Sequence, residues 1–156
     1  MFNSRVARHF FRFFMFYRLQ GRSLQGVRRP PQSNDVCVSY GFRVVPGKDR
    51  VAGGGIVKLQ DLQDVFPNRF AGADILYLVS SALPPYAVAL ARHARRRGVS
   101  IVLNQNGTAY PAWFGSGWQK ANRPMQELVR MADYVLYQSR FCKMAADLHL
   151  GTRSRN

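Results

Sequence analysis

Acidic residues are scarce in this sequence: eight Asp and Glu stand against 23 Lys and Arg, so the formal net charge is +15 at pH 7. Such an excess of positive charge favours anionic partners, namely phosphates, acidic lipids or nucleic acid. Cysteine is also rare, since Cys37 and Cys142 are the only two. Two distant cysteines cannot build a disulfide scaffold, so we expect a reducing compartment, the cytoplasm.

Long apolar runs are missing too, and no stretch approaches the roughly eighteen apolar residues that a transmembrane helix needs. The three histidines, His9, His93 and His149, have no metal-ligand spacing, and no CxxC pair exists. We therefore expect neither a metal site nor a resident cofactor. The 47% hydrophobic content over 156 residues excludes a disordered chain and suits one folded domain.

Charge divides the chain into two parts. Residues 1–34 contain seven Arg and no acid, and on a helical template their Arg and aromatic residues fall on opposite faces. Such a basic N-terminal helix can lie at an anionic membrane surface, with peripheral contact through Arg5–Arg29 at the inner face, or can pack its aromatic face on the domain. An organellar transit peptide fits less well because Ser is scarce. Pro30 and Pro31 end this helix and begin a linker.

From Asp35 the sequence alternates β-rich runs with runs of helical period. This order predicts an α/β domain over 35–151, followed by a short tail, 152–156, outside it. We expect a Rossmann-like sheet of four or more parallel strands, with right-handed crossovers and helices on both faces. The expected strands are 36–40, 74–79, 99–103 and 134–137; helices begin near Gly54, near Pro84, at Pro124 and after the cap Ser139, and the last ends at Gly151.

Ligands of such sheets bind beyond the carboxyl ends of the strands, here in the loops that begin near residues 41, 80, 104 and 138. Gly53, Gly54 and Gly55 open a helix but match neither the dinucleotide fingerprint nor a Walker A loop. Three small residues still let backbone N–H groups approach an anion at a helix N-terminus. We therefore predict a diphosphate site at these glycines; the alternative is a loop without a ligand.

The loop that follows the third strand concentrates amides and rings. Amides that donate and accept hydrogen bonds, beside rings that stack on sugar faces, suit carbohydrate recognition. The alternative is a self-satisfied turn with Tyr110 and Trp113 in the core. The candidate substrate-binding residues of this loop are Asn104, Asn106, Gly107 and Tyr110.

Four segments together resemble a known family: GGGIVKLQDLQDVFP, DILYLVSSALPP, IVLNQNGTAYPAW and ADYVLYQSRFCKMAADLHLG. They are similar to the N-terminal domain of bacterial family-four (group one) retaining glycosyltransferases, over residues 53–151. The resemblance implies two Rossmann-like domains that close on a nucleotide-sugar donor and pass the sugar to a carbohydrate or lipid-linked acceptor. It places Gly54 and Gly55 near the donor diphosphate, lets this domain shape the acceptor site, and adds Ser139 to the substrate-binding candidates.

Two departures from the family matter. Many members carry a His where this sequence reads Asn104, Gln105 and Asn106, so no catalytic residue can be assigned. The family's second domain, with its paired Glu motif, does not follow residue 151, so we expect a fragment that transfers no sugar by itself. The competing hypothesis is a stand-alone basic α/β module that binds anionic membrane lipid or nucleic acid without catalysis.

Overall fold

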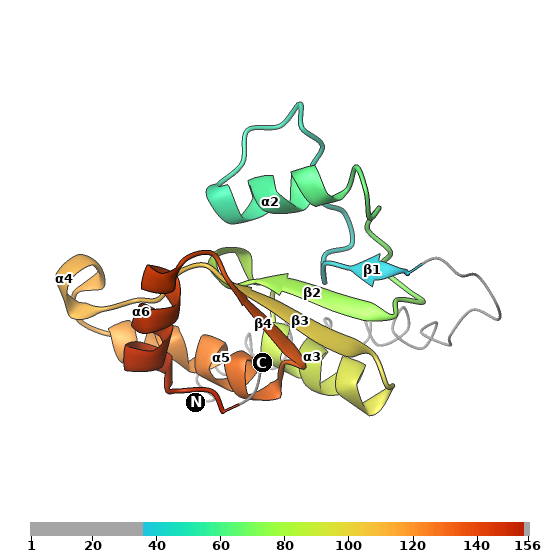
Figure 1. Cartoon of the computed structure of the whole chain (residues 1–156). Helices are drawn as coiled ribbons and strands as arrows, with labels where there is room; N and C mark the ends of the chain where they lie inside the picture. Colours follow the sequence, from blue (N-terminus) through green and yellow to red (C-terminus); the bar gives the residue numbers. More distant parts are fainter. Residues whose placement is uncertain (1–35, 155–156) are drawn as a thin grey trace, which may run out of the picture.

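The computed structural model describes residues 36–154 and places a parallel four-stranded sheet at the centre of the domain (Figure 1). The strands lie side by side in chain order, and every neighbouring pair is parallel. The predicted α/β class with a parallel sheet is therefore confirmed, while the basic helix expected in 1–34 lies outside the described residues. The strands are β1 (Val38–Ser39), β2 (Ile75–Val79), β3 (Ser100–Gln105) and β4 (Tyr134–Tyr137).

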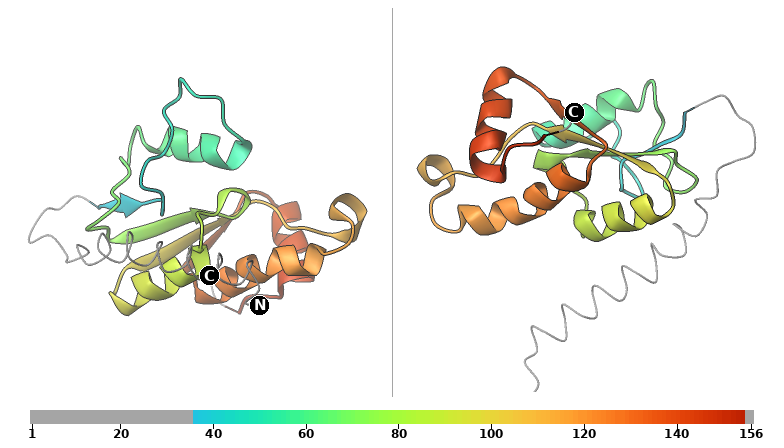
Figure 2. Two further views of the ribbon diagram at one scale, coloured as in Figure 1. Left: turned by 180° about the vertical axis from the view of Figure 1, so that it is seen from behind. Right: turned by 60° about the horizontal axis from the view of Figure 1, so that its bottom comes forward.

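Helices cover both faces of the sheet, as the sequence predicted. α2 lies on one face, and α3 and α5 lie on the other (Figures 1 and 2). α6 follows β4 and packs against α5. The helices are α2 (Gly54–Leu62), the 3-10 turn η1 (Ser80–Ala82), α3 (Ala87–Arg96), α4 (Pro111–Phe114), α5 (Trp118–Met131) and α6 (Arg140–Leu150).

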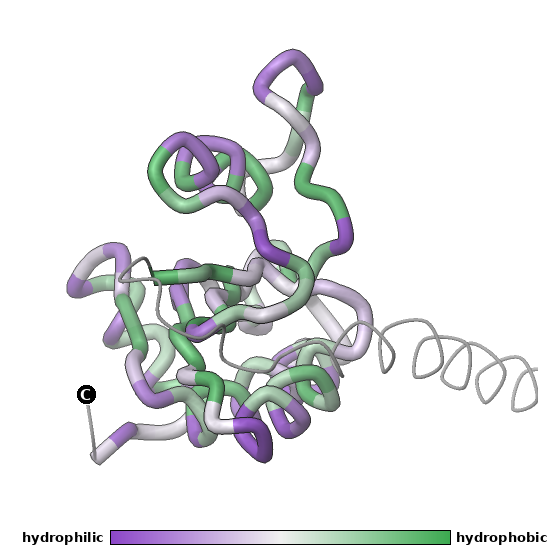
Figure 3. The backbone as a smooth tube through the Cα atoms, turned by 90° about the vertical axis from the view of Figure 1, so that its right-hand side faces the viewer, coloured by the Kyte–Doolittle hydropathy of each residue, from purple (hydrophilic) through white to green (hydrophobic). Residues whose placement is uncertain are grey.

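Alternation along β2 supplies two separate cores, because successive side chains of a strand point to opposite faces. Leu76 and Leu78 join the larger core with α3, α5 and α6. Tyr77 and Val79 join a smaller core with Leu59 of α2. Figure 3 shows the hydrophobic stretches of the chain meeting in the interior, whereas the turn that projects before α2 is hydrophilic. The sheet is thus anchored on both sides.

One crossover connection differs from the expectation that all crossovers of the sheet are right-handed. In a parallel sheet whose strands follow chain order, crossovers of the same hand must all place their helices on the same face. The links β2–α3–β3 and β3–α5–β4 share one face, but α2 lies on the other. The link β1–α2–β2 therefore has the opposite hand to the other two, an uncommon arrangement in parallel sheets.

Two aspartates fix the start of neighbouring strands. Asp74, just before β2, accepts a hydrogen bond from the backbone N–H of Cys37 at 3.0 Å. Asp133, just before β4, does the same for Ile101 at 2.7 Å. Each carboxylate therefore ties its own strand to the strand preceding it in the sequence, and in doing so helps to set the register of the sheet.

Element boundaries differ from the expectation most clearly at α5. This helix begins at Trp118, so Pro124 lies inside it and is not its first residue. Gly117, with φ of 87°, makes the turn that starts the helix. A proline inside a helix removes one backbone hydrogen bond, and here packing of the apolar stripe outweighs that loss. Ser139 and Gly151 do bound α6 as predicted.

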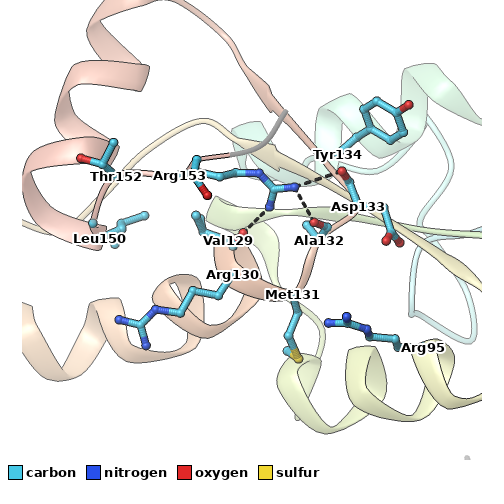
Figure 4. A pocket seen from close by; sticks show the side chains of 12 residues that line it. Arg95, Val129, Arg130, Met131, Ala132, Asp133, Tyr134, Leu150, Thr152 and Arg153 are labelled. Atoms are coloured by element: carbon cyan, nitrogen blue, oxygen red, sulfur yellow. Dashed lines mark hydrogen bonds between the residues drawn. The ribbon is translucent and has the colours of Figure 1, made fainter.

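The chain beyond α6 returns to the domain through Arg153. Its guanidinium donates to the carbonyl of Val129, to that of Ala132 at 2.6 Å and to that of Asp133 at 3.0 Å (Figure 4). These carbonyls lie at and just beyond the end of α5, where a helix leaves acceptors without intrahelical partners. Arg153 thus caps α5 from a distant position in the sequence and lines a hollow of about 430 Å³ beside it.

Candidate functional site

A second hollow, of about 500 Å³, lies at the carboxyl edge of the sheet. The N-terminus of α2 forms one wall, and the segments that follow β2, β3 and β4 form the other. This is the position at which parallel α/β sheets bind ligands. The residues lining the hollow are Gly53, Gly54, Gly55, Ile56, Lys58, Ser81, Ala82, Asn106 and Gln138.

The N-terminus of α2 presents unused hydrogen-bond donors at this hollow. Gly53 caps the helix in an extended conformation, without a side-chain cap, and its carbonyl accepts from Ile56 and Val57. Among the described residues, no acceptor pairs with the N–H groups of Gly54 and Gly55. The first turn also lacks an acidic residue that could neutralise the helix dipole. The helix end is therefore suited to hold an anion.

The three glycines differ in the space that surrounds them. A Cβ at Gly55 would lie 2.5 Å from Ser81 Oγ and 2.6 Å from Ala82 Cβ, so Gly55 lets α2 approach η1. A Cβ at Gly53 or Gly54 would meet no protein atom within 4 Å. Packing therefore demands glycine only at Gly55. At Gly53 and Gly54 the space next to the backbone is open to a ligand.

Asn106 joins the segments that follow β2 and β3. Its Oδ1 accepts from the hydroxyl of Ser80 at 2.8 Å and from the N–H of Ser81 at 3.1 Å. Its Nδ2 donates to Ser81 Oγ at 2.8 Å, and its N–H donates to Ser80 Oγ at 3.0 Å. One hydrogen of the amide group stays available. Asn106 thus holds this wall of the hollow and offers one donor to a ligand.

Lys58 provides the charge of the hollow. Its Nζ donates to Gln138 Oε1 at 2.9 Å, which bridges α2 to the segment after β4. No carboxylate or imidazole is among the lining residues of this described hollow. The acidic side chains of residues 36–154 are bonded elsewhere: Asp49, Asp61, Asp64, Glu127 and Asp147 in ion pairs, Asp74 and Asp133 at strand starts. The electrostatic character of the hollow is therefore positive.

Of the residues predicted from sequence, the structure brings together the three glycines and Asn106, and places the others outside the lining. Asn104 donates to the hydroxyl of Tyr77 at 2.9 Å. The Gly107 carbonyl accepts from Gln105 at 2.5 Å. Tyr110 stacks on the ring of His149, with centroids 5.7 Å apart. Ser139 caps α6 by accepting from the N–H of Cys142 at 3.1 Å.

The prediction missed Lys58, Ser81 and Gln138 as lining residues. Ser81 and Gln138 do lie in two of the loops that the strand ends indicated, so a search of those loops for side-chain donors would have found them. Lys58 occurs four residues after Gly54, one helical turn along α2. Its position gave no sign of Gln138, which is far away in the sequence.

The described residues contain no group of three or more His, Cys, Asp or Glu that could hold a metal ion. None of the helices between residues 36 and 154 has the length and apolar character to cross a bilayer. Comparison with protein families, curated proteins and solved structures found no match. The family resemblance of the sequence segments therefore stays a prediction, and the geometry of the hollow is the main guide to function.

Proposed function

We propose that this chain is a glycosyltransferase-like protein whose α2 hollow binds the diphosphate of a nucleotide-sugar. The observation that carries the proposal is the N-terminus of α2, where the N–H groups of Gly54 and Gly55 have no acceptor among residues 36–154 and the lining described there includes Lys58 but no acid. A diphosphate supplies the acceptors and negative charge that such a site lacks. The similarity of residues 53–151 to the acceptor-side domain of retaining glycosyltransferases supports the same assignment.

Each group has a chemical role in this proposal. Transfer of a sugar leaves negative charge on the departing diphosphate, and the N–H groups of Gly54 and Gly55 with the Lys58 ammonium stabilise that charge. Asn106 and Gln138 offer amide groups, and Ser81 a hydroxyl, to the polar groups of the nucleotide-sugar. Lys58 leaves Gln138 for the phosphate, because an ion pair with a hydrogen bond is stronger than the neutral one. The sequence resemblance assigns the acceptor, a carbohydrate or a lipid-linked sugar, to this same domain.

Calorimetric titration of the full chain with uridine diphosphate and guanosine diphosphate, and with uridine as a phosphate-free control, tests the site. Gly54→Val places a side chain in the space beside the helix end, where a Cβ would meet no protein atom within 4 Å, and we expect at least ~10-fold weaker binding. Lys58→Gln should weaken binding and reduce its salt dependence. Val57→Ala is the matched control, since Val57 is exposed on the same helix but does not line the hollow.

Equal binding by the parent chain and Gly54→Val would refute the diphosphate site, as would equal affinity for uridine. The competing function, lipid or nucleic-acid binding by the basic segment Arg5–Arg29, lies outside the described residues. It predicts binding that falls steeply with salt, falls when Arg8 and Arg12 become Gln, and is unchanged in Gly54→Val.

A further inference from the structure

α4 and α6 lie at one end of the domain (Figure 1), and together they carry five large apolar side chains that are exposed. In α4, Trp113 is 63% and Phe114 44% exposed. In α6, Phe141 and Met144 are each 67% and Leu148 78% exposed, at a spacing that lines them along one side of the helix. Exposed apolar residues that gather in this way mark a surface that binds a partner. We call these five residues the apolar end.

α4 projects from the domain on a fixed base. It stands clear of the sheet in each ribbon view (Figures 1 and 2). Tyr110, which precedes α4, stacks on His149 of α6, and Trp118 of α5 makes an edge contact with the same ring at 5.3 Å. Rings from α5 and α6 therefore meet at the base of the projection, whereas Trp113 and Phe114, in α4 itself, are exposed.

The polar N–H group of the Trp113 indole is already hydrogen-bonded within the protein. It donates to the carbonyl of Thr108 at 3.1 Å, so the one polar group of the ring already has a partner. The exposed part of the side chain is then hydrocarbon alone. A tryptophan of this kind can enter acyl chains without leaving an unpaired donor in a medium that cannot satisfy it.

Cations occur in the same part of the chain: Arg140 directly precedes Phe141, and Lys120 and Arg123 lie in the first half of α5, which packs against α6. Lys120, Arg123 and Arg140 are exposed and make no ion pair with any residue in the described range 36–154. Residues 108–126 contain no acid. Apolar side chains next to unpaired cations are typical of surfaces that rest on anionic lipid, where rings enter the headgroup boundary and cations bind phosphate.

We propose that the apolar end, with Lys120, Arg123 and Arg140, binds the surface of a membrane that contains anionic lipid. A second copy of this chain is the poorer occupant, since the same unpaired cations would face one another across such an interface. The proposal concerns a different surface from the α2 hollow and from the basic segment Arg5–Arg29. It adds a second contact to any that the basic segment makes.

Sedimentation of the full chain with vesicles of equal parts phosphatidylcholine and phosphatidylglycerol measures the binding. We expect the variant Phe141→Ser, Met144→Ser, Leu148→Ser to bind at least ~10-fold more weakly than the parent. Val44→Ser, Val65→Ser is the matched control, because these valines are 74% and 70% exposed elsewhere and should not matter. Arg8 and Arg12 are replaced by Gln in the parent, the α6 variant and the control alike, so that lipid binding by the N-terminal segment does not mask a difference in binding between them. Circular dichroism checks that each variant is folded.

A second measurement does not depend on substitution in α6. Trp113 and Trp118 are the only tryptophans, so Trp118→Phe leaves a single indole, that of Trp113 in α4. Lipids brominated along the acyl chain should quench its fluorescence. Binding without quenching, or equal binding by the α6 variant and its control, would overturn the proposal. So would a parent chain that dimerises without vesicles while the α6 variant stays monomeric, since the surface would then be a protein interface.

Discussion

The same substitution, glycine to alanine, should change the stability of the protein in opposite directions at two adjacent glycines of α2. In Gly55→Ala the new Cβ would lie 2.5 Å from Ser81 Oγ, 2.6 Å from Ala82 Cβ and 3.0 Å from the backbone nitrogen of Ala82. Ser81 Oγ cannot turn away freely, because it accepts from Asn106 Nδ2. Overpacking of this kind costs ~1–3 kcal/mol. Better helix propensity returns at most ~1 kcal/mol, so we expect a net loss of stability of about 1–2 kcal/mol.

Gly54→Ala has only the propensity gain, because its Cβ meets no protein atom within 4 Å. We expect a gain of roughly 0.4–1 kcal/mol from the reduced freedom of the unfolded chain. Urea unfolding of the two variants and the parent gives both free energies, and thermal melting should separate the variants by about 4–8 °C. A stabilised Gly55→Ala, or an equal loss in both variants, would show that α2 does not contact η1 as described.

Three further predictions concern stability. Burial, with the nearby Tyr77, raises the pKa of Tyr40 to about 12 from 10.0, so the folded state loses stability as the pH rises from about 10 to 12. Urea unfolding across this range should show the free energy of unfolding fall by ~2–3 kcal/mol, and Tyr40→Phe should not show this fall. Asn122 is fully buried, and its side chain accepts a hydrogen bond from the N–H of Ala109 and donates one to the carbonyl of Ala109. Asn122→Ala should lower the free energy of unfolding by about 2–4 kcal/mol in the same assay, and a loss under ~1 kcal/mol would contradict this role. Arg153→Lys keeps the charge but not the planar fork that binds the end of α5, so a melting scan should show a loss of about 1–2 kcal/mol, and a stability equal to the parent would refute the cap.

The sequence was informative where a structural feature depends on neighbouring residues. β4 could be placed to the residue because a short β-rich run stands between a helical stripe and the cap Ser139, and α6 because Ser139 and Gly151 bound it. The start of α5 could not be found in this way. Gly117 turns the chain at that point, and Pro124, a residue type that often opens a helix, lies exposed inside α5, whose buried residues Leu128 and Val129 join the core.

The sequence by itself determined the alternation of strands and helices, the parallel sheet and the edge at which a ligand should bind. Periodicity reports which side of each element is buried, and strand ends in a parallel sheet share an edge, so both follow from local pattern. Only the tertiary structure decided the face that α2 covers, the contact of Gly55 with Ser81, the bridge from Lys58 to Gln138 and the cap that Arg153 makes on α5. Each of these joins residues far apart in the chain, and no local periodicity records which distant partner a side chain meets.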